Sequence, residues 1–154
     1  MATTYTALLL RTDSTWQRIQ LQKNLSEFPQ PRDCVGDWVD ILPHFDTLIR
    51  GDNNETERLV AYCDGECLLK QLPENPFYFA LLWHRHTQDK SLGLFHTIRG
   101  DIVVCGSTTD SGGETDNDSI TEQEIQDLLN IVKPYKNITE RQAPLMPITR
   151  PSSR

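Results

Sequence analysis

Apolar residues in this chain occur in short runs, and this pattern constrains the fold more than any other feature of the sequence. The longest strongly apolar run is Phe77–Trp83, far shorter than the roughly 20 residues that a helix needs to cross a bilayer. The first residues, MATTYTALLLRTD, lack the basic start and the small-residue cleavage site of a signal peptide. We therefore expect a cytoplasmic protein that does not associate with membranes.

The order of the predicted elements indicates the fold class. With 154 residues, the chain matches one domain of roughly 100 to 150 residues. Its first half predicts strands over 5–11, 17–21, 38–42 and 47–49, and a short helical turn that starts near Pro31 and is closed by Gly36. Helices and strands do not alternate regularly. The sequence therefore predicts an α+β fold with a mostly antiparallel sheet and two main helices, in a single domain over residues 5–133.

A hairpin is expected around Asp64-Gly65, because a tight type I′ turn needs positive φ at both central residues. Its strands would cover 59–63 and 66–70. The outer strand of such a hairpin would leave an exposed sheet edge. That edge would support a homodimer.

Two segments carry the signals of longer helices. Asn75-Pro76 combines a capping residue with a proline at the first helical position. Its apolar face would contain Phe77, Ala80, Leu81 and His84. Ser119 and Glu122 fit a capping box for a second helix, which Pro134 would end. The second helix would bury Ile125, Leu128, Leu129 and Val132, and two strands, 92–97 and 102–105, are predicted between the helices.

Charge is distributed unevenly around a formal net value of −7. Residues 110–127 contain no Lys or Arg but seven acids: Asp110, Glu114, Asp116, Asp118, Glu122, Glu124 and Asp127. We interpret 107–118 as a flexible acidic loop within the domain and 134–154 as a C-terminal tail. The pI of about 5.0 disfavours nucleic-acid binding, which is typical of domains with a pI above about 9.

Several central segments resemble one known family. These are Val35–Ile41, Asp64–Glu66, Leu72–Pro76 and Gly100–Gly106, followed by the capped helix 119–129. Together they are similar to the domain-of-unknown-function family numbered 3846, which is found largely in phages, plasmids and other mobile elements. Asp37 stands where that family usually has a second glycine, and the stretch 84–96 is longer. The resemblance, over roughly residues 5–132, implies the fold and a viral or mobile-element context, but it transfers no catalytic residue.

The sequence offers few candidates for metal or nucleophilic chemistry. Cys63 and Cys67, with His84 and His86, are residue types that bind zinc. A two-residue turn at Asp64-Gly65 would place the two thiols on opposite faces of the sheet, so we favour no metal and no cofactor. A set of six aromatic residues is expected in the core rather than on a base-stacking surface: Trp38, Phe77, Tyr78, Phe79, Trp83 and Phe95.

Two functions are consistent with these patterns. Because no convergent catalytic set is evident, we expect a non-enzymatic binding protein that contacts a host protein or a second copy of itself. The alternative is a small-molecule or nucleotide pocket between the sheet and the helix from Pro76, in a sequestering protein or a small enzyme. Four residues would supply its polar groups: His84, Arg85, His86 and His96.

Overall fold

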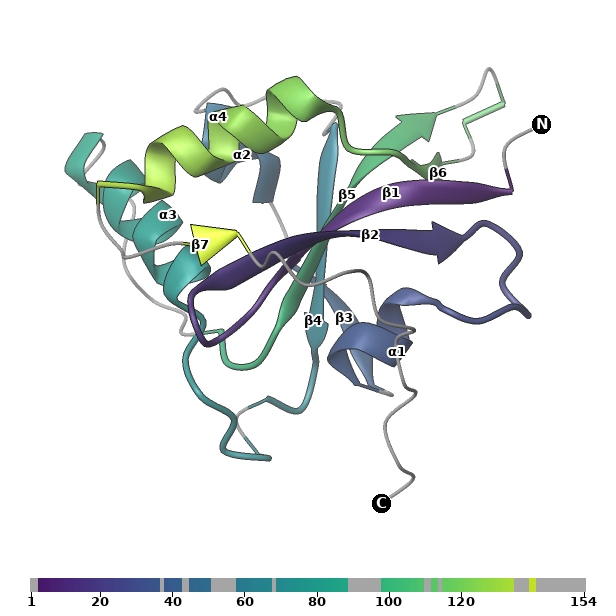
Figure 1. Cartoon of the computed structure of the whole chain (residues 1–154), viewed down its shortest axis with the longest axis horizontal. Coiled ribbons are helices and arrows are strands. Elements are labelled where there is room, and N and C mark those ends of the chain that lie inside the picture. The colour runs from purple at the N-terminus through teal and green to yellow at the C-terminus, as the bar shows by residue number, and fades with distance from the viewer. Residues whose placement is uncertain are drawn as a thin grey trace.

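A mostly antiparallel sheet organises the part of the chain that the structure describes (Figure 1). The computed structural model describes residues 3–36, 38–42, 45–50, 58–67, 69–88, 98–109, 112–113, 115–134 and 139–140. Its strands are β1 Thr4–Leu10, β2 Thr15–Gln22, β3 Val39–Leu42, β4 Leu59–Asp64, β5 Ile102–Thr109, β6 Thr115–Asp118 and β7 Thr139–Glu140. They follow the order β3-β4-β5-β1-β2-β7, and β6 pairs with β5. Every pairing is antiparallel except that of β2 with β7.

The helices cover both faces of this sheet. They are α1 Pro31–Val35, α2 Phe45–Arg50, α3 Pro76–Gln88 and α4 Glu122–Val132. Helices α2, α3 and α4 pack on one face, whereas the short α1 packs on the other (Figure 1). The α+β fold expected from the sequence is confirmed. No helix among the described residues is long and apolar enough to cross a membrane.

Side chains alternate strictly between the two faces, as the period of a β-strand requires. Leu8 and Leu10 of β1 join the helices in the larger core, and Leu9 joins the smaller core under α1. In β5, Val104 belongs to the larger core and Val103 to the smaller one. Burial on both faces explains why these central strands read as continuous apolar runs.

The expectation of a strand over 47–49 is wrong. These residues lie in α2, where Phe45 and Ile49 are both buried one helical turn apart. Asp46 lies in the first turn of the helix. The β-branched residues Thr47 and Ile49 favoured a strand, but the four-residue spacing of the buried side chains is that of a helix.

The hairpin expected at Asp64-Gly65 is also wrong. Strand β4 ends at Asp64, and the described residues after it form turns instead of a returning strand. The Asp64 carboxylate accepts hydrogen bonds from the Glu66 N–H at 2.8 Å and from the Lys70 ammonium group at 2.6 Å. This side chain is only 2% exposed. Its two hydrogen bonds hold the following residues in turns, in place of the tight type I′ turn of a hairpin.

The edge strand on this side of the sheet is β3, which pairs with β4. The Ile41 N–H donates to the carboxylate of its neighbour Asp40 at 2.9 Å. A charged side chain that occupies a backbone donor makes an edge strand a poorer partner for another strand. The homodimer stays a prediction, and its expected edge over residues 66–70 is absent.

The acidic segment 107–118 is largely not a loop. Strand β5 continues through Thr109, and Thr115–Asp118 form β6. The Asn117 side chain accepts from the Tyr62 hydroxyl at 2.7 Å and donates to the Tyr5 hydroxyl at 3.2 Å. A polar hairpin strand has the composition of a loop, and its pairing with β5 distinguishes it from one.

Two further boundaries differ from the expectations. The capping box of α4 consists of Thr121 and Glu124, two residues beyond the expected pair. Ser119 instead accepts the backbone N–H of Thr6 at 2.9 Å. Within the expected tail over 134–154, Thr139–Glu140 form β7. The strand expected over 92–97 lies outside the described residues.

Candidate functional site

Asn75 anchors the start of α3 to the sheet and so fixes the position of the candidate site. Its side-chain amide donates to the carbonyl oxygens of Leu10 and Gly100, both at 3.0 Å. Its Oδ1 atom accepts from the N–H groups of Phe77 and Tyr78 at 3.0 and 3.3 Å. The side chain is 1% exposed and uses both its donors and its acceptor. It caps the helix, as the sequence predicts, and is not available to a ligand.

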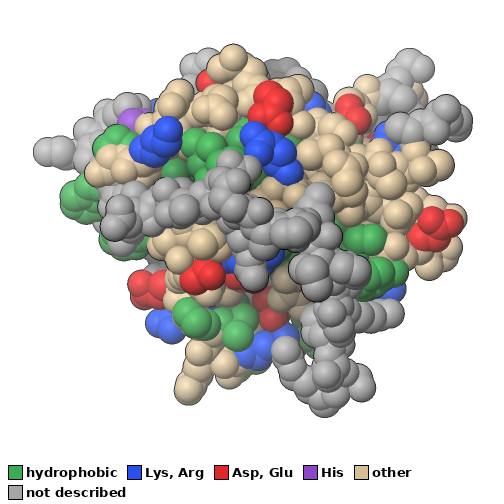
Figure 2. Space-filling view, in the orientation of Figure 1, with side chains coloured by type: hydrophobic (Ala, Val, Ile, Leu, Met, Phe, Trp, Pro, Cys, Tyr) green, Lys and Arg blue, Asp and Glu red, His purple; other side chains and the backbone are tan. Residues whose placement is uncertain are grey.

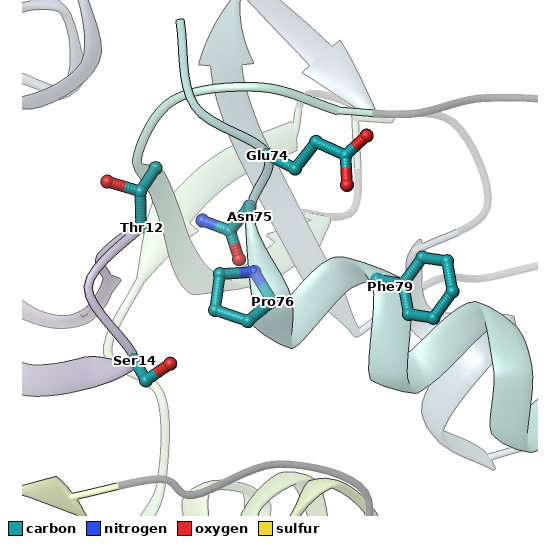
Figure 3. Close-up of a pocket in the computed structure, with 6 residues that line it drawn as sticks. All are labelled: Thr12, Ser14, Glu74, Asn75, Pro76 and Phe79. Carbon is teal, nitrogen blue, oxygen red and sulfur yellow. The ribbon is translucent and has the colours of Figure 1, made fainter.

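A pocket of about 280 Å³ opens beside this anchor, between the β1–β2 turn and the start of α3 (Figure 3). It is lined by Thr12, Ser14, Glu74, Asn75, Pro76 and Phe79. In Figure 3, Thr12 and Ser14 lie on one side of Pro76, and Glu74 and Phe79 lie on the other. The lining thus combines hydroxyl groups, a carboxylate and an aromatic ring.

Backbone contacts hold the turn side of the pocket. The Ser14 N–H donates to the Arg11 carbonyl at 3.2 Å, and Ser14 has a positive φ of 71°. The Thr12 N–H donates to the Asp101 carboxylate at 3.0 Å. Burial raises the pKa of Asp101, and this hydrogen bond from Thr12 opposes the rise. The turn is therefore connected both to its own strands and to the residue just before β5.

The Glu74 carboxylate has spare capacity to accept hydrogen bonds. Glu74 pairs through its backbone with Arg99, in a bridge between the segment before α3 and the segment before β5. The Arg99 Nη2 atom lies 3.8 Å from Glu74 Oε1, which is too long for a hydrogen bond. Arg99 Nη1 donates instead to the Leu72 carbonyl at 3.2 Å. The Glu74 side chain is 57% exposed.

Aromatic residues also reach the surface on α3, which corrects the expectation that the whole aromatic set lies in the core. Phe77 and Tyr78 are buried, but Phe79 is 45% exposed and Trp83 is 41% exposed. Trp38, before β3, is exposed as well, and Phe95 lies outside the described residues. Phe79 and Trp83 are one helical turn apart. In Figure 2, hydrophobic side chains reach the surface on the left, where Figure 1 places α3.

Of the predicted pocket residues, the two whose side chains are described, His84 and Arg85, do not line this pocket. Arg85 donates to the carbonyl oxygens of Leu48 and Ile49 at 3.1 and 3.3 Å, and so caps the end of α2. Partial burial, with the nearby Arg85 charge, lowers the pKa of His84. The side chain of His86 and all of His96 lie outside the described residues. A site built from these residues therefore stays a prediction.

Three of the four cysteine thiols are buried, and that of Cys34 is partly buried. Cys63 and Cys67 are 4% and 7% exposed, and burial, with Cys67 nearby, raises the pKa of Cys63 to about 12. Burial also raises the pKa values of Cys34 and Cys105 to about 12. A thiol with such a pKa is a poor nucleophile at neutral pH. The described residues contain no group of three or more His, Cys, Asp or Glu side chains placed to hold a metal ion.

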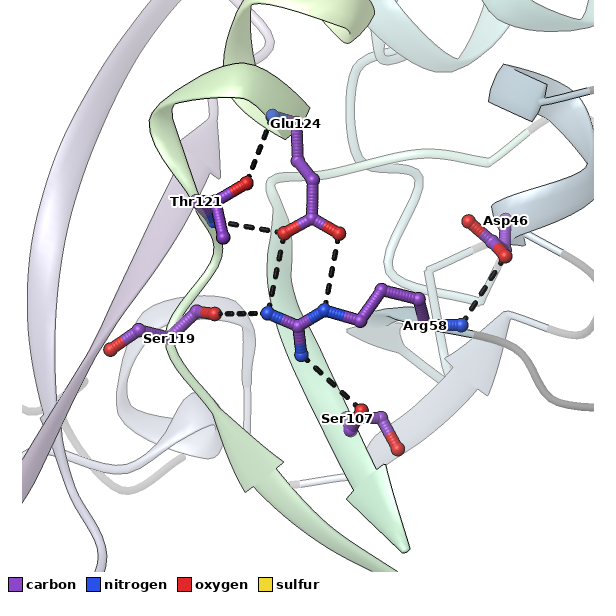
Figure 4. Close-up of polar contacts among 6 residues, drawn as sticks. All are labelled: Asp46, Arg58, Ser107, Ser119, Thr121 and Glu124. Atoms are coloured by element: carbon purple, nitrogen blue, oxygen red, sulfur yellow. Dashed lines mark hydrogen bonds and ion pairs between the residues drawn. The ribbon is translucent and has the colours of Figure 1, made fainter.

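A second polar cluster surrounds Arg58, just before β4 (Figure 4). Its guanidinium donates to the carbonyl oxygens of Ser107 and Ser119 at 3.2 and 2.7 Å. It also contacts both carboxylate oxygens of Glu124, at 3.3 and 3.2 Å. Glu124 in turn accepts from the Thr121 N–H at 2.9 Å. These contacts join β5, the β6–α4 connection and α4, and we interpret the cluster as structural.

Comparison of the chain with family models, with curated proteins and with solved structures found no match. The pocket residues that sequence reasoning missed are Thr12, Ser14, Glu74 and Phe79. Asn75-Pro76 marked the helix start, but nothing local indicated that the β1–β2 turn packs opposite it.

Proposed function

We propose that the protein is a non-enzymatic binding protein that receives a segment of a partner protein in the pocket beside Asn75. The observation that carries this proposal is a pocket with fixed walls that opens beside exposed aromatic side chains. Asn75 ties one wall to the end of β1 and to Gly100 before β5, and the Phe79 ring forms the other wall. Sites that bind peptides combine such a preformed shape with an aromatic anchor.

The pocket chemistry favours binding over catalysis. The lining offers hydroxyl groups on Thr12 and Ser14, but no histidine, lysine or cysteine lies among its six residues. A serine or threonine hydroxyl is a weak nucleophile without an adjacent base. Glu74 carries the one carboxylate among the described lining residues, and it lies on the other side of Pro76 from both hydroxyls in Figure 3.

The resemblance to family 3846 supports a host protein as the partner, because that family occurs largely in mobile elements. The alternative, a small-molecule pocket, is favoured by a volume of about 280 Å³, close to the lower end of ligand pockets at roughly 300 Å³. The lining residues include a carboxylate but no lysine or arginine, and this disfavours a nucleotide as that ligand.

Selection from a random peptide display library tests the proposal without knowledge of the partner. We expect the purified protein to enrich peptides whose binding is lost in Phe79→Ala and kept in Phe28→Ala. Phe28 is a matched control because it has the same residue type and the same 45% exposure, in the β2–α1 connection. Absence of any enriched peptide would contradict the proposed function. Peptides that bind Phe79→Ala as tightly as the wild type would show that the site lies elsewhere.

A further inference from the structure

We infer that the pocket recognises the guanidinium group of an arginine side chain. This inference rests on the proposed function, because the arginine would belong to the partner segment. It follows from the juxtaposition of the Glu74 carboxylate and the Phe79 ring, two groups that together match a planar cation.

The carboxylate supplies the first half of the recognition. Glu74 is 57% exposed, and among the described residues its carboxylate makes only a 3.8 Å contact, with Arg99. Both carboxylate oxygens can therefore accept N–H groups from a ligand, and a guanidinium presents two parallel donors in the geometry that a carboxylate prefers. Arg99 is held by the Leu72 carbonyl at 3.2 Å, which keeps this internal guanidinium out of hydrogen-bonding range of Glu74.

The aromatic ring supplies the second half. Phe79 and Glu74 project on the same side of Pro76 (Figure 3). A guanidinium held by Glu74 can lie against the ring, and arginine stacks on aromatic faces more often than lysine does. The hydroxyl groups of Thr12 and Ser14, across the pocket, can accept the remaining donors.

An anionic ligand fits this site poorly. The first N–H groups of α3, which elsewhere form an anion site, are already bound by Asn75 Oδ1. No lysine, arginine or histidine is among the six lining residues. The formal charge of −7 on the whole chain also attracts a cationic partner over longer distances.

An NMR titration of the full chain, which follows backbone amide shifts, tests this inference. The probe is N-acetyl-arginine methylamide, and the matching control is the citrulline analogue, which has nearly the same shape without the charge. We expect saturable shifts at Thr12, Ser14 and Phe79, and binding at least about tenfold weaker for citrulline, which corresponds to 1.4 kcal/mol. Glu74→Gln should weaken arginine binding to a similar degree. Glu27→Gln, which removes the same charge at another exposed site, should leave it unchanged.

The outcomes separate this inference from the proposed function. Equal binding of arginine and citrulline would overturn charge recognition, and tighter binding of the lysine analogue would overturn the guanidinium assignment. Absence of shifts with the arginine probe would also overturn it. If library selection still enriched Phe79-dependent peptides without arginine, the proposed function would stand while this inference failed.

Discussion

Two arginine–glutamate pairs in this molecule have the same chemistry but different surroundings. Arg58 and Glu124 are mostly buried, with side chains 26% and 15% exposed, and lie at 3.2 Å from each other. Arg99 and Glu74 are 36% and 57% exposed, and lie at 3.8 Å. The Arg58 guanidinium also donates to two backbone carbonyls, whereas Glu74 faces a pocket.

This difference in burial and in contacts indicates that Arg58 and Glu124 form a structural pair, whereas Glu74 is available to bind a ligand. A buried charge that has all its partners rigidifies the fold, and removal of either partner leaves the other unsatisfied. An exposed carboxylate that lines a pocket with an aromatic ring, and that makes no hydrogen bond to the described residues, contributes little to folding and can serve a ligand. The number of satisfied contacts, rather than the residue types, separates the two roles.

The largest effect is expected from Arg58→Met. The substitution keeps much of the side-chain volume but leaves Glu124 and the carbonyls of Ser107 and Ser119 without their donor. We expect the free energy of unfolding to fall by about 3 kcal/mol, because buried polar groups lose their partner. Urea denaturation at pH 7 measures this change. A loss below about 1 kcal/mol, the range of exposed ion pairs, would remove the contrast between the two pairs.

Gly106→Ala tests the same Arg58 cluster by displacing the guanidinium instead of removing it. A Cβ atom on Gly106 would collide with Arg58 Nη1, so the guanidinium would have to move out of its contacts. We expect a loss of about 2 kcal/mol, the range for a broken buried network. The double variant with Arg58→Met should lose much less than the sum of the single losses, because the side chain that collides is absent. Additive losses would show that Gly106 acts independently of Arg58.

The sequence indicated the parts of the fold that depend on local patterns. Asn75-Pro76 identified α3, and the spacing of Ile125 and Leu128 identified the buried side of α4. Failures occurred where a side-chain contact or pairing with another strand decides the structure. Asp64 binds Lys70 where a hairpin was expected, and pairing with β5 makes a strand of 115–118, which has the composition of a loop.

The sequence predicted less of the candidate site than of the fold. The sequence predicts a pocket between the sheet and the helix from Pro76, with polar groups that include residues in the last turns of α3, whereas the pocket described above lies between the β1–β2 turn and the start of this helix. Arg85 is occupied by the carbonyls of α2. The pocket instead depends on the packing of the β1–β2 turn against Glu74, more than 50 residues away in the chain.

A third pair, Arg18 with Glu122, lies between the two extremes and yields a pH prediction. Its atoms approach to 2.7 Å at the surface, and Arg18 also stacks on Trp16. The hydrogen bond from Arg18 lowers the pKa of Glu122 in the folded protein below its ordinary value of 4.5. The stabilisation is therefore present above pH 4.5 and is lost as the pH falls through the folded pKa.

We expect Arg18→Met to lose about 0.5 to 1 kcal/mol at pH 7, as is typical of exposed pairs. The difference from the wild type should shrink at acidic pH and in 1 M salt, which screens exposed charges. Thermal unfolding of both proteins across this pH range measures it. A difference that stays constant with pH and salt would assign the effect to packing of Arg18 on Trp16.

The smallest change in stability is expected from Arg99→Met, which separates the structural role of this pair from a role in recognition. The variant loses one hydrogen bond to the Leu72 carbonyl at a partly exposed position, which is worth about 0.5 kcal/mol. It also removes the positive charge nearest to the Glu74 carboxylate in the described structure. If Glu74 is a recognition group, the arginine probe should bind about two- to threefold more tightly, a gain of roughly 0.5 kcal/mol. A large loss of stability, or weaker binding of the probe, would instead make Arg99 and Glu74 a structural pair like Arg58 and Glu124.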